Sequence, residues 1–141
     1  EFRTAGFREW STNFTYIWGP FYTGELDRYF GSVTWKPSAN FRANIGYDLR
    51  YVNLPEGKFT TRMTNVEIDY IFSPDLSLVN LIQYDNISET VGVNMRLQWV
   101  PQEGQEFFFV INQLMEDYDK DNNFHSAYTD LTVKFSYTFR Y

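Results

Sequence analysis

The sequence predicts an all-β protein whose strands form an antiparallel, up-and-down β-barrel, with eight strands in this chain. Apolar and polar residues alternate with a period of two along most of the 141 residues, as they do in strands with one apolar and one polar face. Short turns that contain proline also alternate with longer polar connections. Aromatic residues, namely 14 Phe, 11 Tyr and 4 Trp, make up 21% of the chain. No segment combines a 3.6-residue period with capping residues, so we expect no helix.

The alternation defines each strand in chain order. The clearest strands are 41–52 and 128–141, and the others are 1–18, 25–36, 59–72, 76–85, 91–100 and 106–115. In the six regular strands the apolar parity carries Trp10, Phe14, Tyr16 and Trp18; Tyr29, Gly31, Val33 and Trp35; Phe41, Ala43, Ile45, Tyr47, Leu49 and Tyr51; Val66, Ile68, Tyr70 and Phe72; Val91, Val93, Met95, Leu97 and Trp99; and Leu131, Val133, Phe135, Tyr137, Phe139 and Tyr141. The segments 76–84 and 106–114 are apolar on both parities, so the period leaves their facing open.

The connections between these strands predict which strand ends lie together. Short turns occupy 36–40, 73–75 and 101–104, whereas longer polar connections occupy 19–25, 52–58, 85–90 and 116–127. Tight turns at one end and long loops at the other are typical of outer-membrane barrels. Eight strands would place both termini at the short-turn end, which is the periplasmic side.

The volume of the aromatic side chains indicates which face of the barrel points outward. An eight-stranded barrel has interior space only for packed side chains or one small ligand. Each large aromatic side chain has about 150–250 Å² of surface to hide, so the aromatic parity does not fit inside. Many of its rings also lie near strand ends, where the aromatic girdles of membrane barrels belong. The sequence therefore predicts a transmembrane barrel with the aromatic face in lipid.

The polar parity would then line the lumen. Its charged residues carry both signs, and we expect them to form a network: Arg28, Arg42, Asp48, Arg50, Glu67, Asp69, Arg96, Lys134 and Arg140. Charges removed from bulk water need partners, so the main interpretation is a cross-linked plug. A contribution to a permeation path or an internal site is the alternative.

Several segments carry a resemblance to a known family. They are 21–25, 53–62, 72–76, 83–86, 94–99 and the ending Val133-Lys134-Phe135-Ser136-Tyr137-Thr138-Phe139-Arg140-Tyr141. Together they resemble the C-terminal β-barrel region of large Gram-negative outer-membrane proteins of unassigned function that carry an N-terminal module similar to family-nine carbohydrate-binding domains. That module is absent here. The resemblance implies that the chain, a single domain over 1–141 or the C-terminal part of one, supplies the last eight strands of a larger barrel.

The last residues also resemble the signal that the barrel assembly machinery recognises. Tyr137, Phe139 and Tyr141 alternate along a strand that ends in an aromatic residue. Deletion of 139–141 is expected to impair assembly in the outer membrane, which heat-modifiable gel mobility would detect.

Two features of the segment 116–127 suggest chemistry. Asp117, Asp119 and Asp121 have the D-x-D-x-D spacing of a calcium loop, but Asn122 and Tyr128 replace the glycine and glutamate that such a loop needs. A solvated acidic loop is the favoured interpretation, and no cofactor is expected. His125 adjoins Ser126, yet neighbours in an extended segment point opposite ways, which argues against a catalytic pair.

The sequence thus predicts a non-catalytic integral protein of the bacterial outer membrane, an anchor or scaffold whose loops form the interaction surface. Its expected partners are membrane lipid, lipopolysaccharide, the barrel assembly machinery and other outer-membrane proteins. A net charge of −6 argues against nucleic acid. A porin-like channel within a wider barrel and a soluble lipocalin-like carrier are the alternatives.

Overall fold

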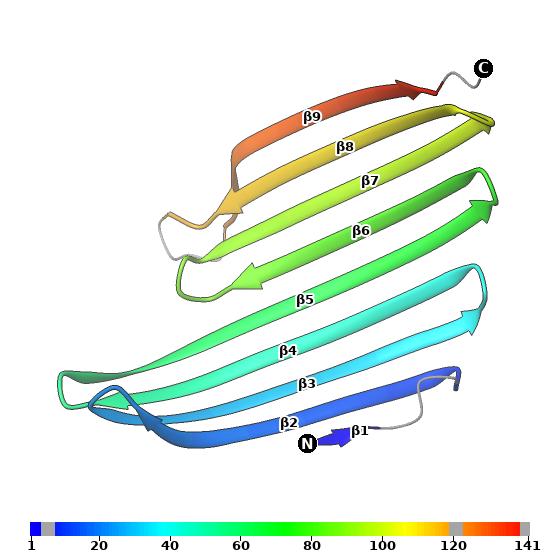
Figure 1. The fold of residues 1–141 in the computed structure, drawn as a ribbon. Coiled ribbons are helices and arrows are strands. Elements are labelled where there is room, and N and C mark those ends of the chain that lie inside the picture. Colours follow the sequence, from blue (N-terminus) through cyan, green and yellow to red (C-terminus); the bar gives the residue numbers. More distant parts are fainter. Residues whose placement is uncertain (4–7, 119–122, 139–141) are drawn as a thin grey trace.

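The computed structural model describes residues 1–3, 8–118 and 123–138, and this part of the chain is all-β. It forms one antiparallel sheet in which nine strands follow each other in sequence order (Figure 1). The strands are β1 (Phe2–Arg3), β2 (Trp10–Phe21), β3 (Gly24–Ser38), β4 (Phe41–Leu54), β5 (Gly57–Ser73), β6 (Leu76–Asp85), β7 (Thr90–Gln102), β8 (Gln105–Glu116) and β9 (His125–Tyr137). Among these residues no helix is long and apolar enough to cross a membrane.

The count of eight strands is wrong at the N-terminus. The predicted strand 1–18 is two strands, because β1 pairs antiparallel with β2 and Phe2 lies opposite Phe14. A two-residue strand leaves no periodic signal in the sequence, so alternation alone could not reveal it. The other seven predicted strands correspond one to one with β3–β9.

The predicted contrast in loop length holds for only half of the sheet. Residues Tyr22 and Thr23 alone join β2 to β3, and Pro55 and Glu56 alone join β4 to β5. The strands run on through segments whose glycines and prolines suggested loops. Pro20, for example, lies in β2, whose outer edge is paired only at Asn13 and Phe14 among the described residues, and proline is tolerated where no ladder hydrogen bond is required.

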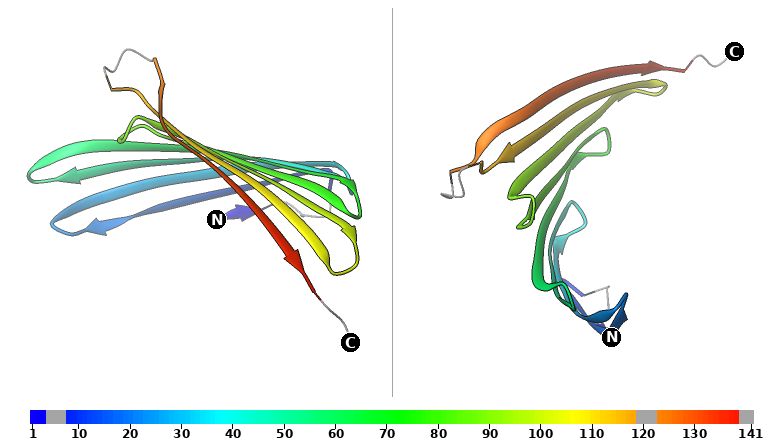
Figure 2. Two further views of the ribbon diagram at one scale, coloured as in Figure 1. Left: turned by 90° about the horizontal axis from the view of Figure 1, so that it is seen from above. Right: turned by 90° about the vertical axis from the view of Figure 1, so that its left-hand side faces the viewer.

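The sheet curls in one direction but is not closed within the described residues (Figure 2). Strands β2 and β9 lie toward opposite sides of the sheet, and no register joins them (Figure 1). The observed object is therefore an open, curved sheet.

The strands are also staggered. A line that follows paired residues from Trp10, the first residue of β2, reaches Leu131 in β9 through Trp35, Ala43, Ile68, Asn80, Met95 and Ile111. Leu131 lies six residues before Tyr137, the last residue of β9. The register has thus shifted, relative to the strand ends, by about six residues across seven strand pairs. Such a shift in register is what barrel closure requires.

Burial distinguishes the two faces. Along β2 the apolar parity is exposed, whereas the polar residues Ser11, Asn13 and Thr15 are half-buried. In β4 the buried residues are Gly46, Asp48 and Val52, which all belong to the polar face. Side chains crowd on the concave side of a curved sheet, so the polar face is the concave face and the aromatic face is convex.

Candidate membrane-embedded surface and polar-face charge network

The convex face carries the aromatic side chains. Strand register places all four tryptophans on it, since Trp10 pairs with Trp35, and Trp99 pairs with Leu76 and Phe107. Trp18 follows Trp10 in β2 with the same parity and is 71% exposed. Rings of this size are costly to leave in water, so the face calls for an apolar environment.

One girdle of aromatic rings runs along the short-turn end of this face. In β2–β5, Trp10 stacks on Trp35 with centroids 5.4 Å apart, and the contacts continue from Trp35 to Phe41, Tyr70 and Phe72. In β7–β9, Trp99 stacks on Phe107 at 5.4 Å, and Phe107 contacts Phe135, which contacts Tyr137. Between the two series β6 contributes Leu76 and Leu78.

A second aromatic group lies at the opposite end of β2–β4. Tyr16 stacks on both Trp18 and Tyr29, and Tyr29 meets Tyr51 edge to face. The Tyr16 hydroxyl donates a hydrogen bond of 2.6 Å to Oδ1 of Asp27. An apolar ring with an anchored polar tip suits a membrane–water interface.

Aliphatic residues fill the band between the two groups. Register places Val33, Ile45, Val66, Ile82 and Val93 side by side across β3–β7. Two amides interrupt the face. Asn80 lies between Ile68 and Met95, whereas Gln113 donates its hydrogen bond to Ser126. Membrane β-barrels carry such an apolar band with aromatic flanks on their exterior.

The concave face holds two ion-paired clusters. In the first, Arg28 and Arg50 lie directly opposite each other, a like-charge pair that would repel. Asp48 lies between them and accepts two hydrogen bonds from each, and its shortest oxygen–nitrogen distances are 2.6 Å to Arg28 and 2.8 Å to Arg50. The Asp48 side chain is only 10% exposed. One carboxylate therefore neutralises two guanidinium groups.

The second cluster joins β4 to β5. Arg42 contacts Glu67 at 2.6 Å and Asp69, its partner in register, at 2.7 Å. These side chains are about one-third exposed, so the cluster is more hydrated than the first. The sequence predicted that all six residues share a face, and the strand register decides which of them pair.

The remaining residues of the predicted network do not join it. Arg96 in β7 and Lys134 in β9 form no ion pair with a described residue, and Arg140 lies outside the described residues. In the predicted assembly signal, Tyr137 ends β9 on the aromatic face beside Phe135. Phe139 and Tyr141 lie outside the described residues.

The two features of the segment 116–127 remain weak. Asp119 and Asp121 lie outside the described residues, and within the described residues no three His, Cys, Asp or Glu side chains form a group able to hold a metal ion. The pKa of the Tyr118 phenol is raised by its hydrogen bond to Glu116. His125 pairs with Glu116, and Ser126 with Met115, so the backbone holds the two residues on opposite faces.

Sequence reasoning left the facing of β6 and β8 open, and the register resolves it. Leu78, Ile82, Phe109 and Ile111 belong to the aromatic face. The concave face receives Val79, Leu81, Val110 and Leu114, together with two amide hydrogen bonds, from Asn94 to Asn112 and from Gln98 to Glu106. The sequence signalled only the β7 side of these bonds, because Asn94 and Gln98 share the polar parity of that strand.

No protein-family model, curated protein or solved structure matches this chain.

Proposed function

We propose that the chain is an integral β-barrel protein of the bacterial outer membrane that acts as an anchor or scaffold without catalysis. The observation that carries this proposal is the convex face, where exposed aromatic groups flank an aliphatic band while the ion pairs lie on the other face. The stagger and curvature of the sheet support a barrel wall. In a lipocalin-like carrier the aromatic face would be the concave one, which is the reverse of this arrangement.

The ends of the strands give the orientation of the proposed barrel. The two-residue turns at 39–40, 74–75 and 103–104 belong to the periplasmic end. Gly104 fits such a turn because its φ is +85° and a Cβ there would lie 2.8 Å from the backbone oxygen of Thr138. The long hairpins β2–β3 and β4–β5, the connection 86–89 and the described residues 117–118 and 123–124 then face outward, where they form the interaction surface.

A wider, channel-forming barrel is a second candidate that one observation favours. Strand β1 already occupies the outer edge of β2 at Asn13 and Phe14. Because β1 runs antiparallel to β2, it runs in the same direction as β9. An all-antiparallel barrel that includes β1 therefore needs an odd number of further strands between β1 and β9. The Oδ1 atom of Asn13, which is buried without a hydrogen-bond partner among the described residues, fits an edge that another strand covers.

Fractionation tests the membrane proposal. The full chain, expressed with an export signal in a Gram-negative host, should remain in the outer-membrane fraction after urea extraction and show heat-modifiable gel mobility. Recovery as a soluble, detergent-free protein would contradict it.

Planar-bilayer recording separates the two candidates. An anchor whose interior is filled should give little steady current, whereas a wider barrel should give stable unitary conductance.

A further inference from the structure

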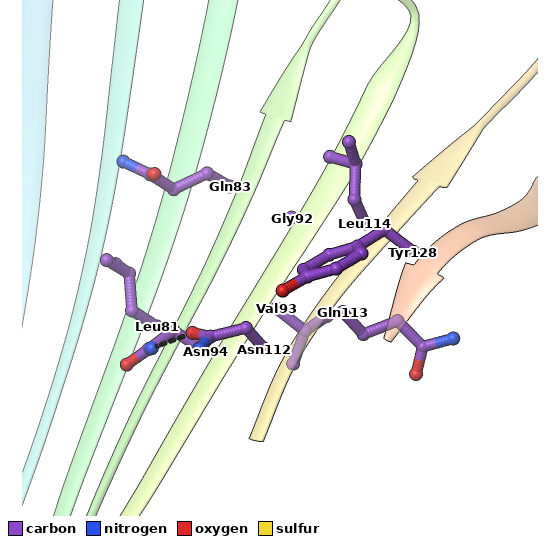
Figure 3. Close-up of a pocket in the computed structure, with 9 residues that line it drawn as sticks. All are labelled: Leu81, Gln83, Gly92, Val93, Asn94, Asn112, Gln113, Leu114 and Tyr128. Carbon is purple, nitrogen blue, oxygen red and sulfur yellow. Dashed lines mark hydrogen bonds between the residues drawn. The ribbon is translucent and has the colours of Figure 1, made fainter. Parts of the chain in front are cut away.

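The concave face of β6–β9 contains an uncharged depression that the proposed anchoring function does not use (Figure 3). Its volume is about 200 Å³, and no charged side chain lines it. The residues that shape it are Leu81, Gln83, Gly92, Asn94, Asn112, Leu114 and Tyr128; Val93 and Gln113 also line it, although the register places their side chains on the convex face.

A missing side chain creates the depression. Gly92 lies between Gln83 and Leu114 in the register of the sheet, and a Cβ built on it would meet no atom within 4 Å. The backbone here is not in the left-handed region, so its conformation does not demand glycine. The glycine leaves an open floor in a row where the neighbouring strands carry side chains.

An aromatic ring borders this floor. Tyr128 in β9 pairs with Leu114, and a β-bulge beside this pair leaves Ala127 without a partner in β8. Tyr128 shares the parity of Asp130 and Thr132 in β9, so it lies on the concave face. Figure 3 shows its ring reaching from β9 across the depression toward Gly92. Tyr128 is 56% exposed, so its ring remains available for contact. Bulges are common next to functional sites.

Three neutral amides provide hydrogen-bonding groups around the ring. Asn94 donates to Oδ1 of Asn112, as the dashed line in Figure 3 shows. This bond leaves the Asn94 oxygen and the Asn112 nitrogen with hydrogen-bonding capacity. Gln83, on the other side of the floor, has no hydrogen bond to a described residue. Donors and acceptors therefore face the same small space as the tyrosine ring.

We propose that this depression binds one ring of an uncharged sugar. A pyranose has an apolar C–H face that can stack on Tyr128 and hydroxyl groups that can donate to and accept from Gln83, Asn94 and Asn112. The volume suits one ring rather than a drug-sized ligand, which occupies about 300–1,000 Å³. A site with one aromatic contact and no charge should bind weakly, with a Kd of about 1–10 mM. The inference goes beyond the proposed function and involves only β6–β9.

Saturation-transfer NMR on the full, folded chain tests the proposal. The probes are methyl glucoside, methyl galactoside and methyl mannoside, with glycerol as a hydroxylated compound that lacks a ring. The protein is kept in a detergent without a sugar headgroup, such as an alkyl amine oxide, because a glycoside detergent would compete for the site. We expect saturable transfer to at least one methyl glycoside and none to glycerol.

Substitutions locate the binding. Gly92→Val fills the floor and Tyr128→Ala removes the ring, and each should weaken binding about tenfold or more. Tyr128→Phe keeps the ring and should retain binding. Gly31→Val is the matched control, because Gly31 is a strand glycine on the opposite face whose added Cβ would meet only Phe14, at 4.0 Å. It should bind as the unsubstituted chain does.

Three results would overturn the proposal: no saturable transfer to any methyl glycoside, equal transfer to glycerol, or unchanged binding in folded Gly92→Val or Tyr128→Ala protein. Equal loss of binding in the Gly31→Val control would also overturn it. If Gly92→Val does not fold, Tyr128→Ala and Tyr128→Phe decide the question. Absence of sugar binding in protein that still partitions into the outer membrane would leave the anchoring proposal intact.

Discussion

The concave face changes character between the first half of the sheet, β2–β5, and the second half, β6–β9. In the first half, Asp48 neutralises two arginines and Arg42 bridges two carboxylates. In the second half no ion pair joins the described residues of the strands β6–β9, where Arg96, Asp130 and Lys134 lie among amides and aliphatic side chains. The convex face carries aromatic and aliphatic residues in both halves. The two halves thus share an apolar convex face, which the proposed membrane location requires. On the concave face, ion pairs cross-link the first half, and an uncharged depression lies in the second.

The substitution with the largest expected effect on this contrast removes the charge of Asp48. Asp48→Asn leaves Arg28 and Arg50 opposite each other on a crowded face, and breaking a buried pair costs about 3–5 kcal/mol. Because the arginines are 34% and 41% exposed, we expect a loss of about 2–3 kcal/mol in the free energy of unfolding. Urea unfolding in lipid vesicles measures it. Asp130→Asn in the second half, where the carboxylate accepts only from Thr132 among the described residues, is the control and should cost less than about 1 kcal/mol. Equal losses of unfolding free energy in Asp48→Asn and Asp130→Asn would contradict the difference between the two halves.

A smaller effect is expected at the second cluster. Arg42→Met removes both ion pairs of a partly hydrated arginine and should lower the unfolding free energy by about 1–2 kcal/mol, with a smaller loss at high salt. Arg96→Met, which removes a cation without an ion pair to a described residue, should change stability by less than about 0.5 kcal/mol. A larger loss for Arg96→Met would show that the second half also depends on charge.

The smallest effects differ in sign between the two faces. Asn80→Leu removes an amide from the aromatic face and should stabilise the protein in vesicles by about 1 kcal/mol, because an amide is costly in hydrocarbon. Asn94→Leu makes the same change on the concave face, breaks the bond to Asn112 and should destabilise by about 1 kcal/mol. Destabilisation by Asn80→Leu would contradict lipid exposure of that face.

The parts of the fold that alternation defines were predictable from the sequence. Strand 41–52 and the aromatic parity of β9 follow from strict period-two patterns. In the structure the predicted strand 41–52 is β4, which runs slightly further, to Leu54. Alternation could not set the facing of β6 and β8, because both parities are apolar and only pairing with β5 and β7 decides. It also could not find β1, or show that β2–β5 run through the segments 19–25 and 52–58.

The candidate sites follow the same logic. The shared polar face of Arg28, Asp48 and Arg50 was predictable, but the pairing of Arg28 opposite Arg50 depends on register between β3 and β4. Gly92 and Tyr128 are far apart in sequence, and only the register of β7 and β9 with β8 brings them to the same part of the concave face. Long-range register is a tertiary property, so period alone does not give it.

Tryptophan fluorescence in lipid vesicles tests the central claim, which is that the aromatic face contacts hydrocarbon. Four single-tryptophan proteins are prepared, retaining Trp10, Trp18, Trp35 or Trp99, with phenylalanine at the other three positions. In vesicles of lipids brominated on the acyl chain near the headgroup, all four should be strongly quenched, and aqueous acrylamide should quench them weakly. Strong quenching by acrylamide with no effect of the brominated lipid would contradict the account.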